Sequence, residues 1–297
     1  MPLIKANGLD IFYDEFGDAA DPAVLLIMGL GTQMIAWSED FCGRLAQQGF
    51  RVIRFDNRDI GLSSKMERSP SYSLPFAMAK AWLGLKVRSP YSLDDMAQDS
   101  VGLLDALNIA QAHIVGASMG GMIAQIVAAK WPERTRSLVS IMSTSGDRRL
   151  PGPTPAARAV LTARRPPPGD REAIIDFGVN ILKTIGSPVY PTPDDELRGF
   201  VETAMRRSVY PAGFVRQLLA ILANGSRVSL LQTIETPTLV LHGEADPLVP
   251  VEGGRDTARR IKGAKIKTIA GWGHDLPPAL VPELVDAIAG HCKAADA

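Results

Sequence analysis

The stretch His113-Ile-Val-Gly-Ala-Ser-Met-Gly-Gly121 decides the fold class of this 297-residue chain. Its apolar start, with two adjacent β-branched residues, predicts a short strand, and the apolar spacing that follows residue 121 predicts a helix. The pattern between them is G-x-S-x-G, which forms a sharp strand-to-helix turn and exposes the hydroxyl of its serine, Ser118. The residues two before and two after that serine crowd each other, so Gly116 and Gly120 fit because they lack a Cβ. We therefore expect Ser118 to act as a nucleophile.

Length and composition suit one large α/β domain, or such a domain carrying an insert. Hydrophobic residues make up 46% of the chain, and the 32 basic and 32 acidic residues balance to a formal charge of zero. This balance gives no electrostatic reason to expect nucleic acid or an anionic membrane as a partner. The two cysteines, Cys42 and Cys292, lack metal-ligand or redox spacing, so we expect neither a metal nor another cofactor.

The start of the chain, residues 1–5, has no apolar run of the kind found in signal peptides. No run of 18 apolar residues occurs either, so a membrane-spanning helix is not expected. The default expectation is a cytoplasmic protein that does not insert into membranes.

Strand and helix patterns alternate over residues 1–145 and again over residues 226–297. Strands are predicted at residues 3–16 (a hairpin turning at Asn7-Gly8), 23–28, 51–55, 136–142, 238–241 and 265–269, and helices at 37–48, 92–107, 255–261 and 278–291. The continuous apolar run at 23–28 is typical of a strand buried on both faces. The alternation predicts a mostly parallel sheet with helices on both faces.

Residues 146–225 differ in composition from the rest of the chain. They hold two proline clusters, at 151–155 and 166–168, and helical patterns around 172–185 and 194–205, without a clear strand. We therefore expect a helical cap insert at 146–225, on a core domain made of 1–145 and 226–297. A short apolar stretch at 74–85 also interrupts the alternation of strands and helices. A short helix packed on the body of the protein is the simpler interpretation, and a lip of the substrate pocket is the alternative.

A serine hydroxyl is a poor nucleophile near neutral pH and needs an adjacent base. The chain has four histidines: His113, His242, His274 and His291. The order serine, acid, histidine that accompanies G-x-S-x-G places the base late in the chain. His274 lies in a loop directly after the strand at 265–269, and such loops carry ligand chemistry in parallel sheets. His291 lies at the end of the last predicted helix and is expected to be solvated or to interact with the helix terminus.

The acid is expected in the loop that follows the strand at 238–241. Asp246 lies there, where it would hold the tautomer of His274 and stabilise the imidazolium. Glu244 is the local alternative, and we expect it to face solvent or to brace the loop. Asp275 adjoins the histidine in sequence, so its side chain should not readily reach the far nitrogen of the same ring.

Two backbone N–H groups are expected to form an oxyanion hole. One belongs to Met119, at the N-terminus of the helix that follows the nucleophile. The other should come from the loop after the strand at 23–28, and we assign it to Leu30, between Gly29 and Gly31.

These motifs together resemble the α/β-hydrolase fold superfamily over about residues 1–145 and 226–297. The matching pieces are GASMGG at 116–121, HGEADPLVP at 242–250 and GHD at 273–275. The resemblance implies an eight-stranded, mostly parallel sheet. More narrowly, IMGLG at 27–31 and FDNRDIGLS at 55–63 resemble cytosolic bacterial carboxylesterases and aclacinomycin methylesterase-like enzymes. Met28 departs from the pattern, because many relatives have histidine there.

The expected function is cofactor-independent hydrolysis of carboxylic esters through an acyl-enzyme intermediate. Short-to-medium chain esters or small alkyl esters, such as methyl esters, are the expected small-molecule substrates, and the oligomeric state stays open. Carbon–carbon bond hydrolysis of dienoic diketones or acyl transfer would use the same three side chains, and perhydrolysis is usually a side activity. A non-catalytic ligand-binding protein on this scaffold is the alternative from another class. Haloalkane dehalogenases and epoxide hydrolases need an aspartate nucleophile, and Ser118 argues against both.

Overall fold

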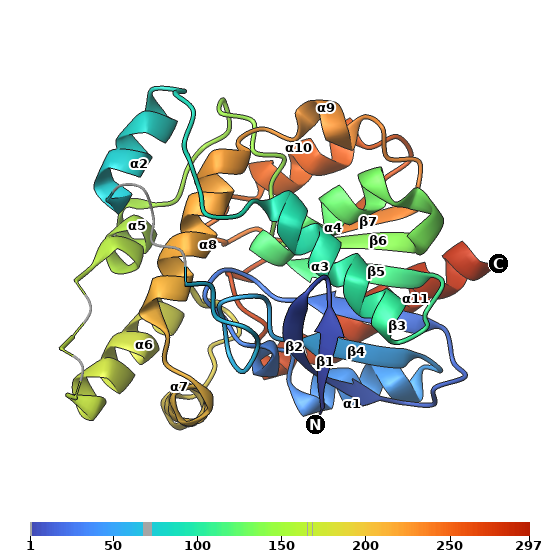
Figure 1. Cartoon of the computed structure of the whole chain (residues 1–297), viewed down its shortest axis with the longest axis horizontal. Coiled ribbons are helices and arrows are strands. Elements are labelled where there is room, and N and C mark those ends of the chain that lie inside the picture. Colours follow the sequence, from blue (N-terminus) through green and yellow to red (C-terminus); the bar gives the residue numbers. More distant parts are fainter. Residues whose placement is uncertain (1, 68–72, 165, 168) are drawn as a thin grey trace.

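An eight-stranded sheet runs through the computed structural model, which describes residues 2–67, 73–164, 166–167 and 169–297 (Figure 1). Its strands are β1 (Leu3–Ala6), β2 (Leu9–Phe16), β3 (Ala23–Ile27), β4 (Arg51–Phe55), β5 (Ala112–Ala117), β6 (Thr135–Ile141), β7 (Thr238–Gly243) and β8 (Lys265–Ile269). They follow the order β1-β2-β4-β3-β5-β6-β7-β8. The β1–β2 and β2–β4 pairs are antiparallel, and from β4 to β8 neighbouring strands are parallel. The predicted mostly parallel sheet is confirmed.

The hairpin at the N-terminus turns where the sequence predicts. Asn7 and Gly8 both have positive φ values, 48° and 77°, as a tight two-residue turn between right-twisted strands requires.

Helices cover both faces of the sheet. They are α1 (Glu39–Gln47), α3 (Leu93–Ala106), α4 (Met119–Lys130), α10 (Glu252–Arg260) and α11 (Val281–Asp296). The side chains of α3 and α4 belong to one core, and those of α1 and α11 belong to the other. Along β3, Leu25 and Ile27 enter the first core while Val24 and Leu26 enter the second. This explains why the strand is apolar at every position.

The start of α3 is closed by the capping arrangement that its sequence indicates. The Ser92 hydroxyl accepts a hydrogen bond from the Asp95 N–H, and the Asp95 carboxylate accepts one from the Ser92 N–H.

Within the described residues, the connection between β6 and β7 consists of helices joined by loops, with no strand. It contains α5 (Pro155–Thr162), α6 (Arg171–Ile185), α7 (Asp194–Arg207), α8 (Pro211–Asn224) and the short α9 (Val228–Leu231). The sequence patterns predicted α6 and α7 but not α5 and α8, both of which begin with a proline at their first position. Arg165 and Pro168, a member of the second proline cluster, lie outside the described residues. In Figure 1, α5 to α8 gather at one side of the molecule, together with α2.

The apolar stretch at 74–85 forms the helix α2 (Leu74–Trp82) and a short turn. Its buried residue Ala77 packs with Val87 and with Leu219 of α8, so α2 contacts the β6–β7 connection rather than the sheet. Trp82 is 80% exposed. In the part of the chain that the structure describes, no helix is long and apolar enough to cross a membrane.

Candidate active site

The turn between β5 and α4 holds Ser118 in a strained backbone conformation, with φ 56° and ψ −118°. A Cβ at position 116 would lie 2.1 Å from the Gly120 carbonyl oxygen, and a Cβ at position 120 would lie 2.0 Å from the Ile27 oxygen. Both glycines are therefore required by close backbone contacts, as the sequence predicts. The turn places Ser118 directly beyond the carboxyl end of β5.

Ser118, His274 and Asp246 form one continuous hydrogen-bonded chain of side chains. The His274 Nε2 lies 3.0 Å from the Ser118 Oγ, and the His274 Nδ1 lies 2.7 Å from the Asp246 Oδ2. An ionised carboxylate only accepts hydrogen bonds, so Nδ1 carries the ring proton and Nε2 offers its lone pair to the serine hydroxyl. The three residues follow β5, β8 and β7, and the parallel strands bring them to the same edge of the sheet.

Asp246 is buried, and its second oxygen is occupied. The Asp246 Oδ1 accepts hydrogen bonds from the N–H groups of Leu248 at 2.9 Å and Val249 at 2.8 Å. Burial by itself would raise the pKa of Asp246, but His274, the neighbouring His242 and the Val249 N–H outweigh it and hold that pKa well below its usual range. Asp246 is therefore ionised near neutral pH.

A carboxyl group whose pKa is lower in the folded than in the unfolded chain stabilises the fold above its ordinary pKa of about 4. That contribution disappears as the pH falls through the unfolded value towards the folded one. We expect the difference in free energy of unfolding between wild type and Asp246→Asn to shrink by on the order of 1–2 kcal/mol between pH 5 and pH 2. Urea denaturation at several pH values in this window measures it, since other acidic groups titrate alike in both proteins. Parallel curves would show that Asp246 has no depressed pKa.

The other acidic residues considered from sequence lie outside this chain of hydrogen bonds. Glu244 is exposed and accepts a hydrogen bond from the Thr268 hydroxyl, so it braces its loop as expected. The carboxylate of Asp275 accepts hydrogen bonds from the hydroxyl and the N–H of Ser187, and burial raises the pKa of Asp275. His291 lies within the last helix, α11, and its Nε2 is 3.2 Å from the carbonyl oxygen of Pro237.

A second Ser–His–Asp arrangement occurs at the opposite edge of the sheet. The His113 Nδ1 lies 2.9 Å from the Ser137 Oγ, and the His113 Nε2 lies 3.2 Å from the Asp296 Oδ2. His113 and Ser137 are completely buried near the starts of β5 and β6. Five residues of strand, roughly 16 Å, separate position 113 from Ser118. Since no substrate carbonyl can reach a fully buried hydroxyl, this arrangement fastens α11 to the sheet.

The two predicted oxyanion donors belong to segments that border Ser118. A Cβ at Gly29 would lie 3.1 Å from the Ser118 Cβ, so the loop that carries Leu30 borders the serine. Met119 is the first residue of α4, where an N–H group has no partner within the helix. Within the described residues, the N–H groups of Leu30 and Met119 donate no hydrogen bond, which leaves both free for a ligand.

Two segments of the β6–β7 connection contact this site, and sequence reasoning missed both. The Gly31 N–H donates to the Gln217 Oε1 at 2.9 Å, from α8. The His274 N–H donates to the Ile185 carbonyl at 2.7 Å, and the Gly273 N–H donates to the Ser187 hydroxyl at 2.9 Å, both at the end of α6. No local pattern predicts such contacts, because the partners lie about 90 to 190 residues apart in the chain.

Comparison with known proteins agrees with this geometry. Residues 22–277 match the family described as the α/β hydrolase fold, so the chain belongs to that family. The rhodomycin D methylesterases DauP, from a Streptomyces strain, and DnrP, from Streptomyces peucetius, are each 29% identical to it, with 99% of this chain and 98% of the relative covered. The crystallised meta-cleavage product hydrolase CumD from Pseudomonas fluorescens superposes with a TM-score of 0.78 at 22% identity, covering 99% and 98% of the two chains. The protein is a serine hydrolase of this fold.

Proposed function

We propose that this protein is a carboxylesterase that cleaves short-to-medium chain or small alkyl esters, methyl esters among them, through an acyl-enzyme intermediate. The hydrogen-bonded chain from Asp246 through His274 to Ser118 is the observation that carries the proposal. The names of the two full-length relatives, which are methylesterases, support an ester as the substrate.

In the first half of the reaction, the Ser118 Oγ attacks the ester carbonyl while the His274 Nε2 takes the hydroxyl proton. The carbonyl oxygen becomes an oxyanion, which the N–H groups of Leu30 and Met119 stabilise by hydrogen bonds. Asp246 stays ionised, holds the Nδ1–H tautomer and stabilises the imidazolium. Collapse of the tetrahedral intermediate breaks the bond to the alcohol oxygen, and His274 returns the proton to the departing alcohol.

In the second half, a water molecule attacks the acyl carbonyl and gives one proton to His274. The same two N–H groups stabilise the second oxyanion. Breakage of the Ser118 ester bond releases the carboxylic acid, and the serine oxygen recovers its proton from His274. No oxidant, metal or further reactant is needed for this balance.

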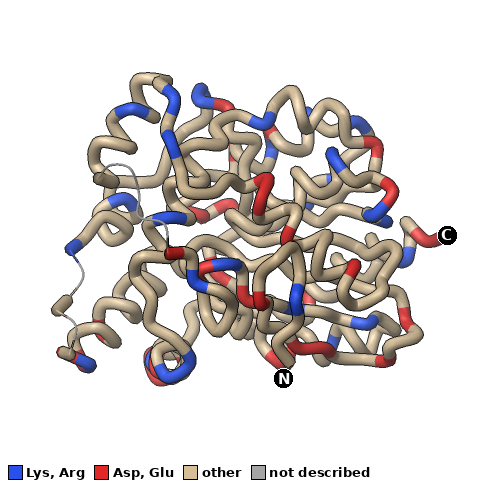
Figure 2. Tube along the Cα trace, viewed as in Figure 1, with Lys and Arg blue, Asp and Glu red and all other residues tan. Residues whose placement is uncertain are grey.

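Residues 146–225 form, in this proposal, a cap that limits the size of the substrate. Among its described residues, Val189 and Val209 are the large apolar side chains that stand exposed. Both signs of charge occur on α6 and α7 (Figure 2), where Arg198 pairs with Glu172 and Asp176. A lid for oil–water interfaces would present a large continuous apolar face instead.

Arg207, at the end of α7, is partly buried rather than part of this charged surface. The Arg207 guanidinium lies 2.9 Å from the buried Asp56 carboxylate, which also accepts the Met34 N–H, and it donates to the Gln33 side chain. It fastens α7 to the core rather than facing solvent. Arg206, its neighbour, is exposed.

Nitrophenyl esters of increasing acyl length test the predicted size limit. We expect kcat/KM to peak at short or medium chains and to fall for long ones, with little hydrolysis of emulsified long-chain triglyceride. An optimum at long chains, with the rate rising once substrate forms an interface, would contradict the proposed cap. It would point to α2 instead, whose Phe76 and Trp82 are 56% and 80% exposed.

A fluorophosphonate probe separates an esterase from a ligand-binding protein on this scaffold. The probe phosphonylates a serine only when the adjacent base and the oxyanion donors are competent. Stoichiometric labelling of Ser118, located by mass spectrometry, is expected. An unlabelled, folded protein that turns over no ester would support the binding function.

A further inference from the structure

The loop that carries the Leu30 N–H has little rigidity of its own. Leu30 lies between Gly29 and Gly31, and Gly31 has a φ of +67°. Within the loop, the Thr32 N–H donates to the Gly29 carbonyl over a long 3.4 Å, and the Thr32 hydroxyl donates to the Leu30 carbonyl at 3.1 Å. Glycine samples both signs of φ readily, so these contacts alone leave the orientation of the peptide groups poorly fixed.

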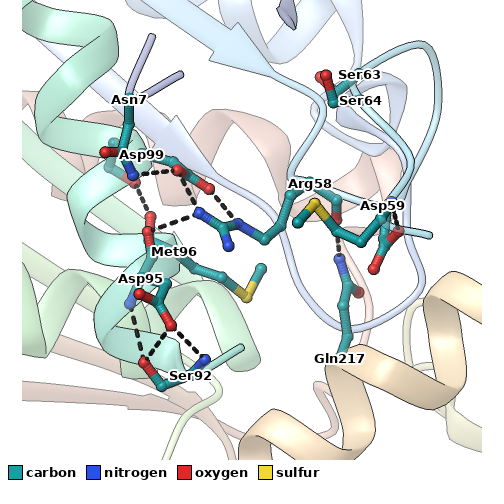
Figure 3. A network of polar contacts seen from close by, with 12 residues as sticks. Asn7, Arg58, Asp59, Ser63, Ser64, Ser92, Asp95, Met96, Asp99 and Gln217 are labelled. Atoms are coloured by element: carbon teal, nitrogen blue, oxygen red, sulfur yellow. Dashed lines mark hydrogen bonds and ion pairs between the residues drawn. The ribbon is translucent and has the colours of Figure 1, made fainter. Parts of the chain in front are cut away.

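The Gln217 side chain of α8 joins this loop to the core by hydrogen bonds. Gln217 is completely buried, and both atoms of its amide are used. Its Oε1 accepts the Gly31 N–H at 2.9 Å. Its Nε2 donates to the Arg58 carbonyl at 2.9 Å, and Figure 3 shows this second hydrogen bond. A neutral group that both accepts and donates is required there, because one partner is an N–H and the other is a carbonyl.

The Arg58 end of this bridge is firmly held. The Arg58 guanidinium donates twice to the Asp99 carboxylate of α3, at 2.5 and 2.6 Å, and Asn7 donates to the same carboxylate at 2.8 Å (Figure 3). The next residue back, Asn57, donates to the Met28 carbonyl at 2.9 Å. Gln217 is therefore bonded to the backbone of a residue whose side chain is fixed by a buried, bidentate ion pair.

The rest of α8 packs closely on the loop at 29–31 and on the loop that contains Arg58 and Asp59. This packing holds the Gln217 side chain between the two loops. A Cβ at Gly213 would lie 2.1 Å from the Asp59 carbonyl oxygen, and a Cβ at Gly31 would lie 2.5 Å from the Phe214 ring. Arg216 binds the Asp59 carboxylate through two nitrogens, at 2.8 and 2.9 Å.

We propose that Gln217 is a positioning residue for the oxyanion hole, so that the β6–β7 connection orients the Leu30 N–H as well as covering the site. The inference rests on the proposed function, because the hole matters only if an oxyanion forms. Gln217 touches no reacting atom. It fixes the Leu30–Gly31 peptide, and the neighbouring Gly29–Leu30 peptide that bears the donor follows.

The variants Gln217→Met and Gln217→Glu test this role with nitrophenyl butyrate as substrate. Methionine keeps the volume and removes both hydrogen bonds. We expect kcat to fall about 10- to 100-fold with KM changed less than about threefold, since a donor displaced by a fraction of an ångström loses most of its effect in the transition state. The rate of fluorophosphonate labelling should fall in parallel.

Gln217→Glu adds a readout that a structural role alone would not produce. An ionised carboxylate can accept the Gly31 N–H but repels the Arg58 carbonyl, whereas a protonated carboxyl group can still donate to it. The ratio of kcat between this variant and the wild type should therefore rise as the pH is lowered, measured where both proteins stay folded.

Gln125 provides a matched control. It is a completely buried glutamine whose Nε2 donates to the Ser140 hydroxyl and whose Oε1 accepts from Arg227, away from the oxyanion loop. Gln125→Met should lower the melting temperature comparably but leave kcat within about threefold of the wild type. Equal kcat losses in the two methionine variants would overturn the role of Gln217 but leave the proposed function standing. An unchanged kcat in Gln217→Met, with an active wild type, would do the same. A wild type that neither hydrolyses esters nor reacts with the fluorophosphonate overturns the proposed function with it.

Discussion

Replacing Ser118 with alanine is expected to lower kcat for ester hydrolysis by on the order of 10⁴–10⁶ while the protein stays folded. The variant removes the Oγ that faces His274 at 3.0 Å and leaves every backbone contact of the turn in place. The Ser118 side chain makes no capping hydrogen bond to α4, and alanine keeps the Cβ, so the melting temperature should change little.

Ser137→Ala is the matched control for this experiment. It also removes a hydroxyl within hydrogen-bonding distance of a histidine, but at the buried edge of the sheet near α11. It should cost some stability and leave kcat near the wild-type value. Both variants are compared by steady-state kinetics, circular dichroism and thermal denaturation. If Ser118→Ala kept more than a tenth of the activity, or if Ser137→Ala were the inactive protein, the nucleophile would have to be reassigned.

The central part of the fold is predictable because its determinants are local. The apolar runs of β3 and β5 predict buried strands by themselves. The G-x-S-x-G pattern predicts the close approach of Gly116 to Gly120. Asp246 and His274 could be named for a related reason. Each follows a strand in sequence, and parallel strands must present their carboxyl ends at one edge. The structure adds the distances that join them.

The parts that could not be predicted depend on contacts between distant segments. Gln217 looks like any polar residue in an amphipathic helix, and only the packing of α8 on the loops at 29–31 and 56–63 shows that it is buried. Arg207 resembles a surface charge for the same reason, since its partner Asp56 lies 151 residues away. The order in space of α5 to α8 likewise depends on tertiary packing, for which the local pattern holds no signal.

The base and the acid should differ in how much of the activity they control. His274→Ala is expected to lose on the order of 10⁴–10⁶ in kcat, because no other group takes the serine proton. Asp246→Asn should lose somewhat less, about 10²–10⁴, because an amide NH₂ facing Nδ1 favours the wrong tautomer while the serine–histidine contact persists.

Three neighbours of these residues serve as controls: Asp275→Asn, Glu244→Gln and His291→Ala. Each should keep kcat/KM within about tenfold of the wild type, because the hydrogen bonds of these side chains go to Ser187, to Thr268 and to the Pro237 carbonyl rather than to the His274 ring. Asp275→Asn should show the largest effect of the three, since Asp275 holds Ser187, which in turn accepts the Gly273 N–H next to the base. Measuring kcat/KM for all five variants on one ester decides the assignment. An inactive Glu244→Gln beside an active Asp246→Asn would transfer the role of the acid to Glu244. An inactive Asp275→Asn would show that the orientation of the loop at His274, rather than the tautomer of the His274 ring, limits the reaction.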